Sequence, residues 1–223
     1  MNERLQAELA ALQREMHALR LAQARDPAAQ PSRLALRQAI DALVDGGALA
    51  NAMAAGERAP DLVLPDAAGK RIRLASLLRR GPIVLAFFRG DWCPYCRLEL
   101  QALNALREEV GARNAALLAV SPQTVAASRR TRRLLGLDFP LLSDPAGSAT
   151  AAFRVAWQAP ALLRPGGCAG AACATLPLAA RYVIGADGIV AYAEVNADPR
   201  MRGDPAALIP VLERLGAVHG GRG

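Results

Sequence analysis

Histidine and lysine are nearly absent from this chain of 223 residues. The only lysine is Lys70, and the two histidines, His17 and His219, lie near opposite ends of the chain. Two histidines so far apart exclude a metal site built on a histidine cluster, and neither is a good candidate for a general base. No glycine-rich phosphate loop follows an apolar strand pattern. We therefore expect no metal and no cofactor, and chemistry must rest on other side chains.

Long hydrophobic runs are also missing. No apolar stretch approaches the roughly eighteen residues that a membrane span needs. Three of the first ten residues are charged, in the region where an export signal would need its apolar run. We therefore expect a cytoplasmic protein with no membrane partner. Thiols stay reduced in that compartment, so the four cysteines indicate redox chemistry or metal binding before structural disulfides.

The net charge of +7 raises the question of a nucleic-acid partner. With a single lysine, 26 of the 27 basic residues are arginine, and Ala, Leu and Gly are abundant. This bias is typical of genome composition rather than of a phosphate-binding track. The densest basic run, residues 129–133, lies in a predicted helix and indicates a solvated helix face, with an acidic partner as the alternative. We therefore expect no nucleic-acid partner.

The first segment carries a stripe of apolar residues. Leu5, Leu9, Leu12, Met16 and Leu19 are spaced four, three, four and three apart, which predicts one face of a helix. The stripe needs a partner, either the rest of the chain or a second copy in a homodimer. Another predicted helix ends at Gly46 and Gly47. Residues 1–56 are therefore expected to form a helical extension.

From Gly56 onward, short apolar strand patterns alternate with helical ones. The expected strands lie at 61–65, 70–74, 82–88, 115–121 and 139–144, and a hairpin spans 181–195. The expected helices lie at 76–80, 94–110, 124–136, 146–153 and 204–216, and residues 159–176 have the composition of a Gly/Ala-rich loop. The order predicts an α/β domain over 57–216, with a mixed central sheet flanked by helices, and a flexible tail at 217–223.

Two cysteines, Cys93 and Cys96, stand where the strand at 82–88 gives way to a helix. Free backbone N–H groups and the positive end of the helix dipole stabilise a thiolate at such a junction. With Cys93 at the cap, the two sulfurs can approach disulfide distance. Two alternatives stay open. The spacing could be accidental, or these cysteines could bind zinc together with Cys168 and Cys173.

Several stretches, in matching order, carry a resemblance to a known family. They are APDLVLPD, the WCPYC segment, LLAVSPQT, FPLLSDPAG and RYVIGADGIV. From about Gly56 to Leu215 the chain resembles the peroxiredoxin-like proteins of the alkyl hydroperoxide reductase/thiol-specific antioxidant group. That group belongs to the thioredoxin-like superfamily, so the resemblance implies a thioredoxin-like fold.

The active-site stretch departs from the pattern of the group, which is P-x-x-x-T-x-x-C. Here Arg89 replaces the proline, Cys93 replaces the threonine, and Cys96 holds the place of the peroxidatic cysteine. Glu99 fits the acidic residue that commonly follows. A thiol is a weaker hydrogen-bonding group than the threonine hydroxyl. The resemblance therefore implies peroxide turnover that is slower than usual or that uses another geometry.

The arginine that flanks the pocket in this group is displaced. Its place holds Ala179, and Arg181 lies two residues later on the same strand face, as a candidate or as an ordinary surface arginine. WCPYC also resembles the thioredoxin motif, in which Cys93 would attack. The proline that thioredoxins place before this strand is missing, since Ala179 stands there and Pro177 lies two residues early.

The resemblance implies an oxidoreductase that reduces hydrogen peroxide or an organic hydroperoxide. Cys96 would attack, Cys93 would resolve the sulfenic acid as a disulfide, and a thioredoxin or a small thiol would reduce that disulfide. Cys168 and Cys173 are then auxiliary thiols, and Trp92 and Tyr95 frame the thiol pocket. The alternatives are a thiol–disulfide oxidoreductase with Cys93 as nucleophile, and a redox sensor without enzymatic activity.

Overall fold

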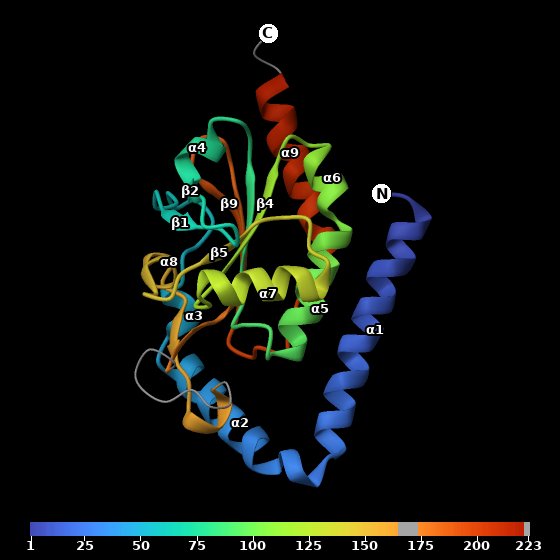
Figure 1. Cartoon of the computed structure of the whole chain (residues 1–223), viewed down its shortest axis with the longest axis vertical. Helices are drawn as coiled ribbons and strands as arrows, with labels where there is room; N and C mark the ends of the chain where they lie inside the picture. The colour runs from blue at the N-terminus through green and yellow to red at the C-terminus, as the bar shows by residue number, and fades with distance from the viewer. Residues whose placement is uncertain (165–173, 221–223) are drawn as a thin grey trace.

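The central sheet has five strands in the order β5-β4-β3-β8-β9 (Figure 1). The computed structural model describes residues 1–164 and 174–220, with side chains up to residue 216. The strands are β3 (Ile83–Phe87), β4 (Ala116–Ser121), β5 (Leu141–Ser143), β8 (Ala179–Ile184) and β9 (Val190–Asn196). Strands β3, β4 and β5 run parallel, whereas β8 pairs antiparallel with both β3 and β9. The expected mixed sheet is therefore confirmed.

Helices cover both faces of this sheet because its central strand is apolar on both faces, as every residue of β3 is buried. Val84 and Ala86 belong to a core shared with α5 (Pro94–Ala105), α6 (Arg107–Gly111) and α9 (Leu208–Gly220). Ile83, Leu85 and Phe87 belong to a second core on the opposite face. That face carries α4 (Leu74–Leu78), α8 (Ser148–Ala152) and the strand pair β6 (Ala156–Gln158) and β7 (Thr175–Pro177). Helix α7 (Val125–Leu135) packs against β5.

Most of the predicted elements are present. The strands expected at 61–65 and 70–74 are β1 (Val63–Pro65) and β2 (Arg71–Arg73), which pair antiparallel. The loop expected at 159–176 is partly wrong, because η2 (Ala161–Leu163) and β7 lie within it. Cys168 and Cys173 fall outside the described residues. At the carboxyl end, η4 (Pro205–Ala207) precedes α9, which continues to Gly220, beyond the start of the tail expected at 217.

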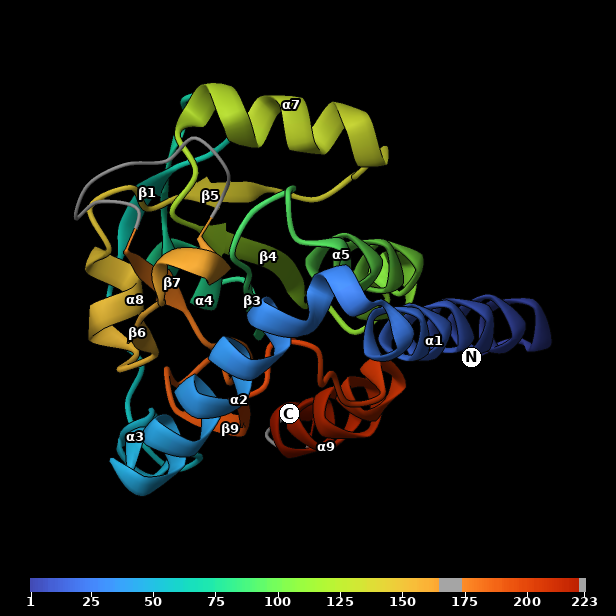
Figure 2. The same cartoon turned by 90° about the horizontal axis from the view of Figure 1, so that it is seen from below.

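The helical extension lies along the domain and then turns beneath it (Figure 2). It consists of α1 (Glu3–Arg25), η1 (Pro27–Ala29), α2 (Gln30–Asp45) and α3 (Ala48–Asn51). Leu9 and Met16, from the predicted apolar stripe, are 4% and 6% exposed in the core that α5 shares. The stripe therefore packs on its own domain, and it gives no argument for a homodimer.

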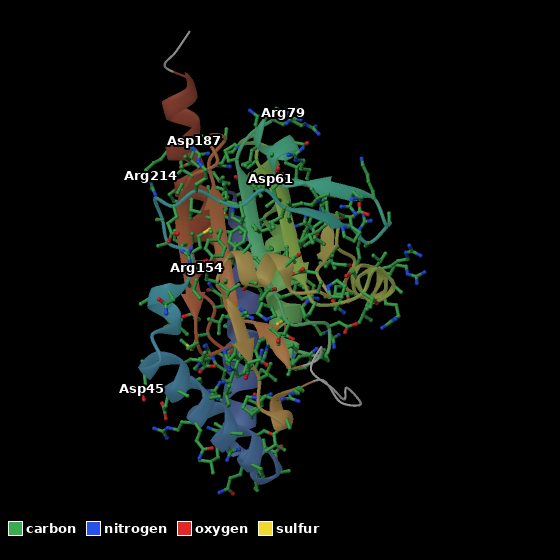
Figure 3. The ribbon with its side chains drawn as sticks, turned by 90° about the vertical axis from the view of Figure 1, so that its left-hand side faces the viewer. Asp45, Asp61, Arg79, Arg154, Asp187 and Arg214 are labelled. Carbon is green, nitrogen blue, oxygen red and sulfur yellow. The ribbon has the colours of Figure 1, made fainter. Side chains whose placement is uncertain are left out.

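The far end of the extension is also fastened to the domain. The Arg154 side chain, labelled in Figure 3, donates to the carbonyl oxygen of Asn51 over 2.6 Å and forms an ion pair with Glu57. The backbone N–H of Met53 donates to the carbonyl oxygen of Phe153 over 3.1 Å. Because both ends are held, α1 stays alongside α5 and α2 stays below the sheet (Figure 1).

Replacing Leu9 by alanine should lower the free energy of unfolding by about 2–3 kcal/mol, because the change removes buried methyl groups and leaves a cavity. Urea unfolding measures this value. The matched control is Leu21→Ala on the same helix, where the side chain is 43% exposed and the cost should stay below about 0.5 kcal/mol. Equal costs at the two positions would show that α1 does not pack on the domain in solution.

Candidate active site

Cys93 caps α5, the helix that follows β3 along the chain. It has extended backbone angles, φ −89° and ψ 111°, and Pro94 follows at the first helical position, where the missing N–H costs nothing. The backbone N–H of Cys96 donates to the sulfur of Cys93 over 3.4 Å. The expected cap position of Cys93 is therefore found, and the two thiols, both fully buried, lie within one turn of each other.

Arg89 lies over Cys93, in the loop between β3 and α5. Its Nη2 donates to the Cys93 sulfur over 3.0 Å, and its guanidinium carbon lies 5.2 Å from the centre of the Trp92 ring. The ring can lie this close to the backbone only because residue 90 is glycine. Gly90 has φ +147°, and a Cβ there would come within 2.6 Å of the indole nitrogen of Trp92.

Arg202 lies against Cys96. Its Nη2 donates to the Cys96 sulfur over 3.5 Å, and its side chain is only 5% exposed. Arg202 comes from the irregular segment between β9 and η4. The next residue, Gly203, fastens that segment through its N–H, which donates to Glu194 over 2.7 Å. A Cβ at Gly203 would meet the same carboxylate at 2.7 Å, so a larger residue there would displace the Glu194 side chain.

A buried group of charges surrounds this contact. Glu99, on α5, lies between two arginines: its carboxylate is 3.5 Å from Nε of Arg181 and 4.0 Å from Nε of Arg202. Arg181 also pairs with Glu194. Arg181 is only 3% exposed, so it is not the ordinary surface arginine that the sequence left as an alternative. In the part of the chain that the structure describes, however, the thiols receive hydrogen bonds from Arg89 and Arg202, and none from Arg181.

These surroundings shift the pKa values of the two thiols in opposite directions. Burial alone would raise the pKa of Cys96, but the hydrogen bond with Cys93 and the charges of Arg202 and Arg89 outweigh it, and the pKa falls well below its usual value. Burial and the neighbouring Cys96 raise the pKa of Cys93 instead. Burial likewise raises the pKa of Glu99, against the effect of Arg181 and Arg202. The surroundings therefore favour the thiolate on Cys96 over the thiolate on Cys93.

A cavity of about 320 Å³ has Cys93 among its lining residues, although the thiol itself is fully buried. Trp92 and Tyr95 line it, as the sequence predicts, and the Tyr95 hydroxyl donates to the Gln23 side chain over 2.8 Å. Cys96 is not among the lining residues, so it lies behind Cys93 as seen from the cavity.

A second hollow, of about 640 Å³, is lined by Asp61, Arg79 and Asp187 at the opposite end of the sheet, away from α2 (Figure 3).

The structure bears on metal and membrane binding only within residues 1–164 and 174–220. There, no three His, Cys, Asp or Glu side chains lie close enough together to hold a metal ion. The zinc alternative also needs Cys168 and Cys173, which are outside these ranges. Among the described helices, none combines the length and the apolar character needed to cross a membrane.

The sequence profile of the AhpC/TSA family matches residues 55–193. The chain belongs to this family. Two groups of curated relatives are similar to part of this chain. A curated protein of Mycobacterium tuberculosis, named as a peroxiredoxin, is 33% identical over 103 residues, which are 46% of this chain and 67% of that protein. The thiol-disulfide oxidoreductase ResA of Bacillus thuringiensis is 31% identical over 93 residues, 41% of this chain and 53% of ResA.

Solved structures agree with the AhpC/TSA assignment. The crystal structure of peroxidoxin BcpB from Mycobacterium tuberculosis covers 74% of this chain and 98% of its own, with a TM-score of 0.58 and 26% identity. Peroxiredoxin Q of Xanthomonas campestris covers 70% and 90%, with a TM-score of 0.54 and 22% identity, which supports the fold alone. The expected thioredoxin-like fold is confirmed, and residues 1–54 of the extension lie outside the family match.

Proposed function

We propose that this chain is a thiol-dependent peroxidase in which the Cys96 thiolate attacks the peroxide. Within an AhpC/TSA domain, the supporting observation is the contact of Arg202 with Cys96, which favours the thiolate at neutral pH. The thiolate sulfur attacks the terminal peroxide oxygen, the O–O bond breaks, and the alkoxide or hydroxide that leaves takes up a proton. Cys96 is oxidised to the sulfenic acid, and the peroxide is reduced to an alcohol or water.

The second step uses the neighbouring thiol. Cys93 condenses with the sulfenic acid of Cys96, which forms the disulfide and releases water. Two thiol equivalents, from a thioredoxin-type protein or a small thiol, then restore both cysteines. Cys168 and Cys173 are auxiliary in this scheme. Arg181 acts through Glu99 and Glu194 as a positioning residue rather than on the sulfur. The reducing cytoplasm supplies the reductant that the cycle needs.

Two observations favour a second function, thiol–disulfide exchange with Cys93 as nucleophile. Cys93 is the thiol that lines the cavity, and ResA, a relative of similar identity, is named as a thiol-disulfide oxidoreductase. The raised pKa of Cys93 argues against it, because the thiolate is the attacking form. We therefore rank it second.

Two assays on the purified chain separate the candidates. We expect peroxide consumption in the presence of a thiol reductant to proceed at least tenfold faster than the reagent background, and insulin disulfides to be reduced no faster than by that reductant alone. The double variant Cys93→Ser/Cys96→Ser is the background control. Insulin reduction without peroxide consumption would establish the second function instead. Inactivity in both assays would favour the redox sensor.

A further inference from the structure

One wall of the Cys93 cavity comes from the helical extension. Gln23, at the end of α1, and Arg33 and Leu36, on α2, line the cavity together with Cys93. None of these three extension residues lies within the family match of 55–193. The hydrogen bond between Tyr95 and Gln23 fixes this wall against the active-site helix. The extension therefore takes part in deciding which molecules reach the thiol.

The cavity is strongly basic. Four arginines line it, Arg33, Arg89, Arg164 and Arg200, and no acidic side chain is among its described lining residues. Arg200 is neutralised by an ion pair with Asp198 over 2.7 Å. Arg89 points its guanidinium at the Cys93 sulfur. The other two, Arg33 and Arg164, contact neither a carboxylate nor a sulfur within the described residues.

Arg33 and Arg164 are held in place by neutral groups only. Nη1 of Arg33 donates to the carbonyl oxygen of Gln23 over 2.7 Å, and Nε of Arg164 donates to the carbonyl oxygen of Ala159 over 2.9 Å. Neither has an acidic partner within the described residues, and the sequence of residues 165–173, next to Arg164, contains no Asp or Glu. Both side chains are thus oriented by the fold while their charge stays available to a ligand.

The rest of the lining is mainly apolar. Leu36, Trp92, Leu162 and Pro199 lie among the lining residues, and Leu162 and Trp92 are 62% and 37% exposed. A volume of about 320 Å³ falls at the small end of the range for pockets that bind organic molecules. The cavity thus offers two available positive charges, apolar walls and a thiol.

We propose that this cavity binds a small amphipathic carboxylate beside Cys93, with Arg33 and Arg164 attracting the carboxylate and the apolar lining holding the body. Such a molecule would be either the hydroperoxide substrate or the reducing thiol, and in this respect the inference rests on the proposed function. Arg33, contributed by the extension, is then a specificity-determining residue outside the family domain.

Paired alkylating reagents test the charge preference without any need for peroxidase activity. Iodoacetate and iodoacetamide differ mainly in the carboxylate, and both react with the thiolate of the same cysteine, with loss of iodide. The ratio of their two rates therefore cancels any change in thiolate fraction. We expect Arg33→Gln and Arg164→Gln each to lower the iodoacetate-to-iodoacetamide ratio by about threefold to tenfold, as for a partly exposed charge pair. Fragmentation mass spectrometry resolves Cys93 from Cys96 within the peptide that holds both, and it measures the rates at Cys93, the thiol that lines the cavity.

The control is Arg37→Gln, on the same helix α2 but outside the cavity lining, which should leave the ratio unchanged. An equal ratio in wild type, Arg33→Gln and Arg164→Gln would overturn the proposal. Two substrate pairs then identify the ligand: a medium-chain carboxylic acid hydroperoxide against its methyl ester, and 3-mercaptopropionate against 2-mercaptoethanol.

A lower KM for the anionic member of one pair, lost in Arg33→Gln, would show which role the carboxylate plays. No preference in either pair would overturn the substrate assignment. A chain that consumes no peroxide would refute the proposed function, and the alkylation ratio would still decide for or against the carboxylate site.

Discussion

Replacing Cys96 by serine should reduce peroxide consumption by about three orders of magnitude or more, because a serine hydroxyl is not ionised at neutral pH and cannot replace the thiolate. Among the residues that the structure describes, the other thiol at the site is Cys93. Cys93 has a raised pKa, since it is buried and lies beside Cys96. Stopped-flow measurement of peroxide loss, with the enzyme in excess, isolates the first oxidation step from the reductant.

Replacing Cys93 by serine serves as the matched variant, one turn away in the same buried site. Its first oxidation should proceed, and the sulfenic acid should accumulate on Cys96, because the thiol that condenses with it is gone. A sulfenic-acid trap followed by mass spectrometry locates the adduct. If the trap instead labels Cys93 in the Cys96→Ser protein at nearly the wild-type rate, the two roles are exchanged.

Replacing Arg202 by glutamine should slow peroxide consumption, at pH values below the wild-type pKa of Cys96, by about tenfold for each unit by which that pKa rises. Arg202 donates to the Cys96 sulfur, and its charge is among the effects that lower that pKa. The sign follows from the thiolate fraction. Below the wild-type pKa of Cys96 the variant shows its full deficit, and the deficit shrinks as the pH rises through the higher pKa of the variant.

The pH profile of the first oxidation step, or of iodoacetamide alkylation at Cys96, measures this shift. Arg107→Gln is the control, because Arg107 pairs with Glu108 and Asp138 on the surface and should leave the profile in place. Thermal unfolding of both variants separates a kinetic effect from a loss of fold. A uniform loss of rate at every pH would mean that Arg202 contacts the substrate and does not set the thiolate pKa.

Local sequence patterns predicted the elements that carry the cysteines. The run 82–88, apolar at every position, indicates a strand buried on both faces, and β3 is such a strand. The Cys93-Pro94 pair indicates a helix start, because proline suits the first helical position, and α5 begins at Pro94. The apolar stripe predicted α1 but not its partner, because a heptad pattern fits a second copy as well as the domain.

Arg202 was missed because nothing in the local pattern of its segment indicates an inward side chain. The segment has no strand or helix periodicity, and its position depends on hydrogen bonds to other elements: from Arg20 to Met201, from Arg202 to Cys96 and from Gly203 to Glu194. The cavity wall was missed for the same reason. Gln23 and Tyr95 are separated by 72 positions, and only the packing of α1 on α5 brings them together. Contacts of this kind follow from tertiary structure and leave no period in the sequence.

The cap of α5 is also one of the two redox atoms, which links the reduction potential to helix stability. In the reduced chain the Cys93 sulfur accepts the N–H of Cys96, so the helix start stabilises the dithiol. If the cap is worth on the order of 1 kcal/mol and is lost in the disulfide, the couple becomes more oxidising by about 20 mV. Each oxidation would then loosen the first turn and each reduction would restore it. A group that strengthens the start of α5 more in the dithiol than in the disulfide would thereby make the disulfide easier to reduce.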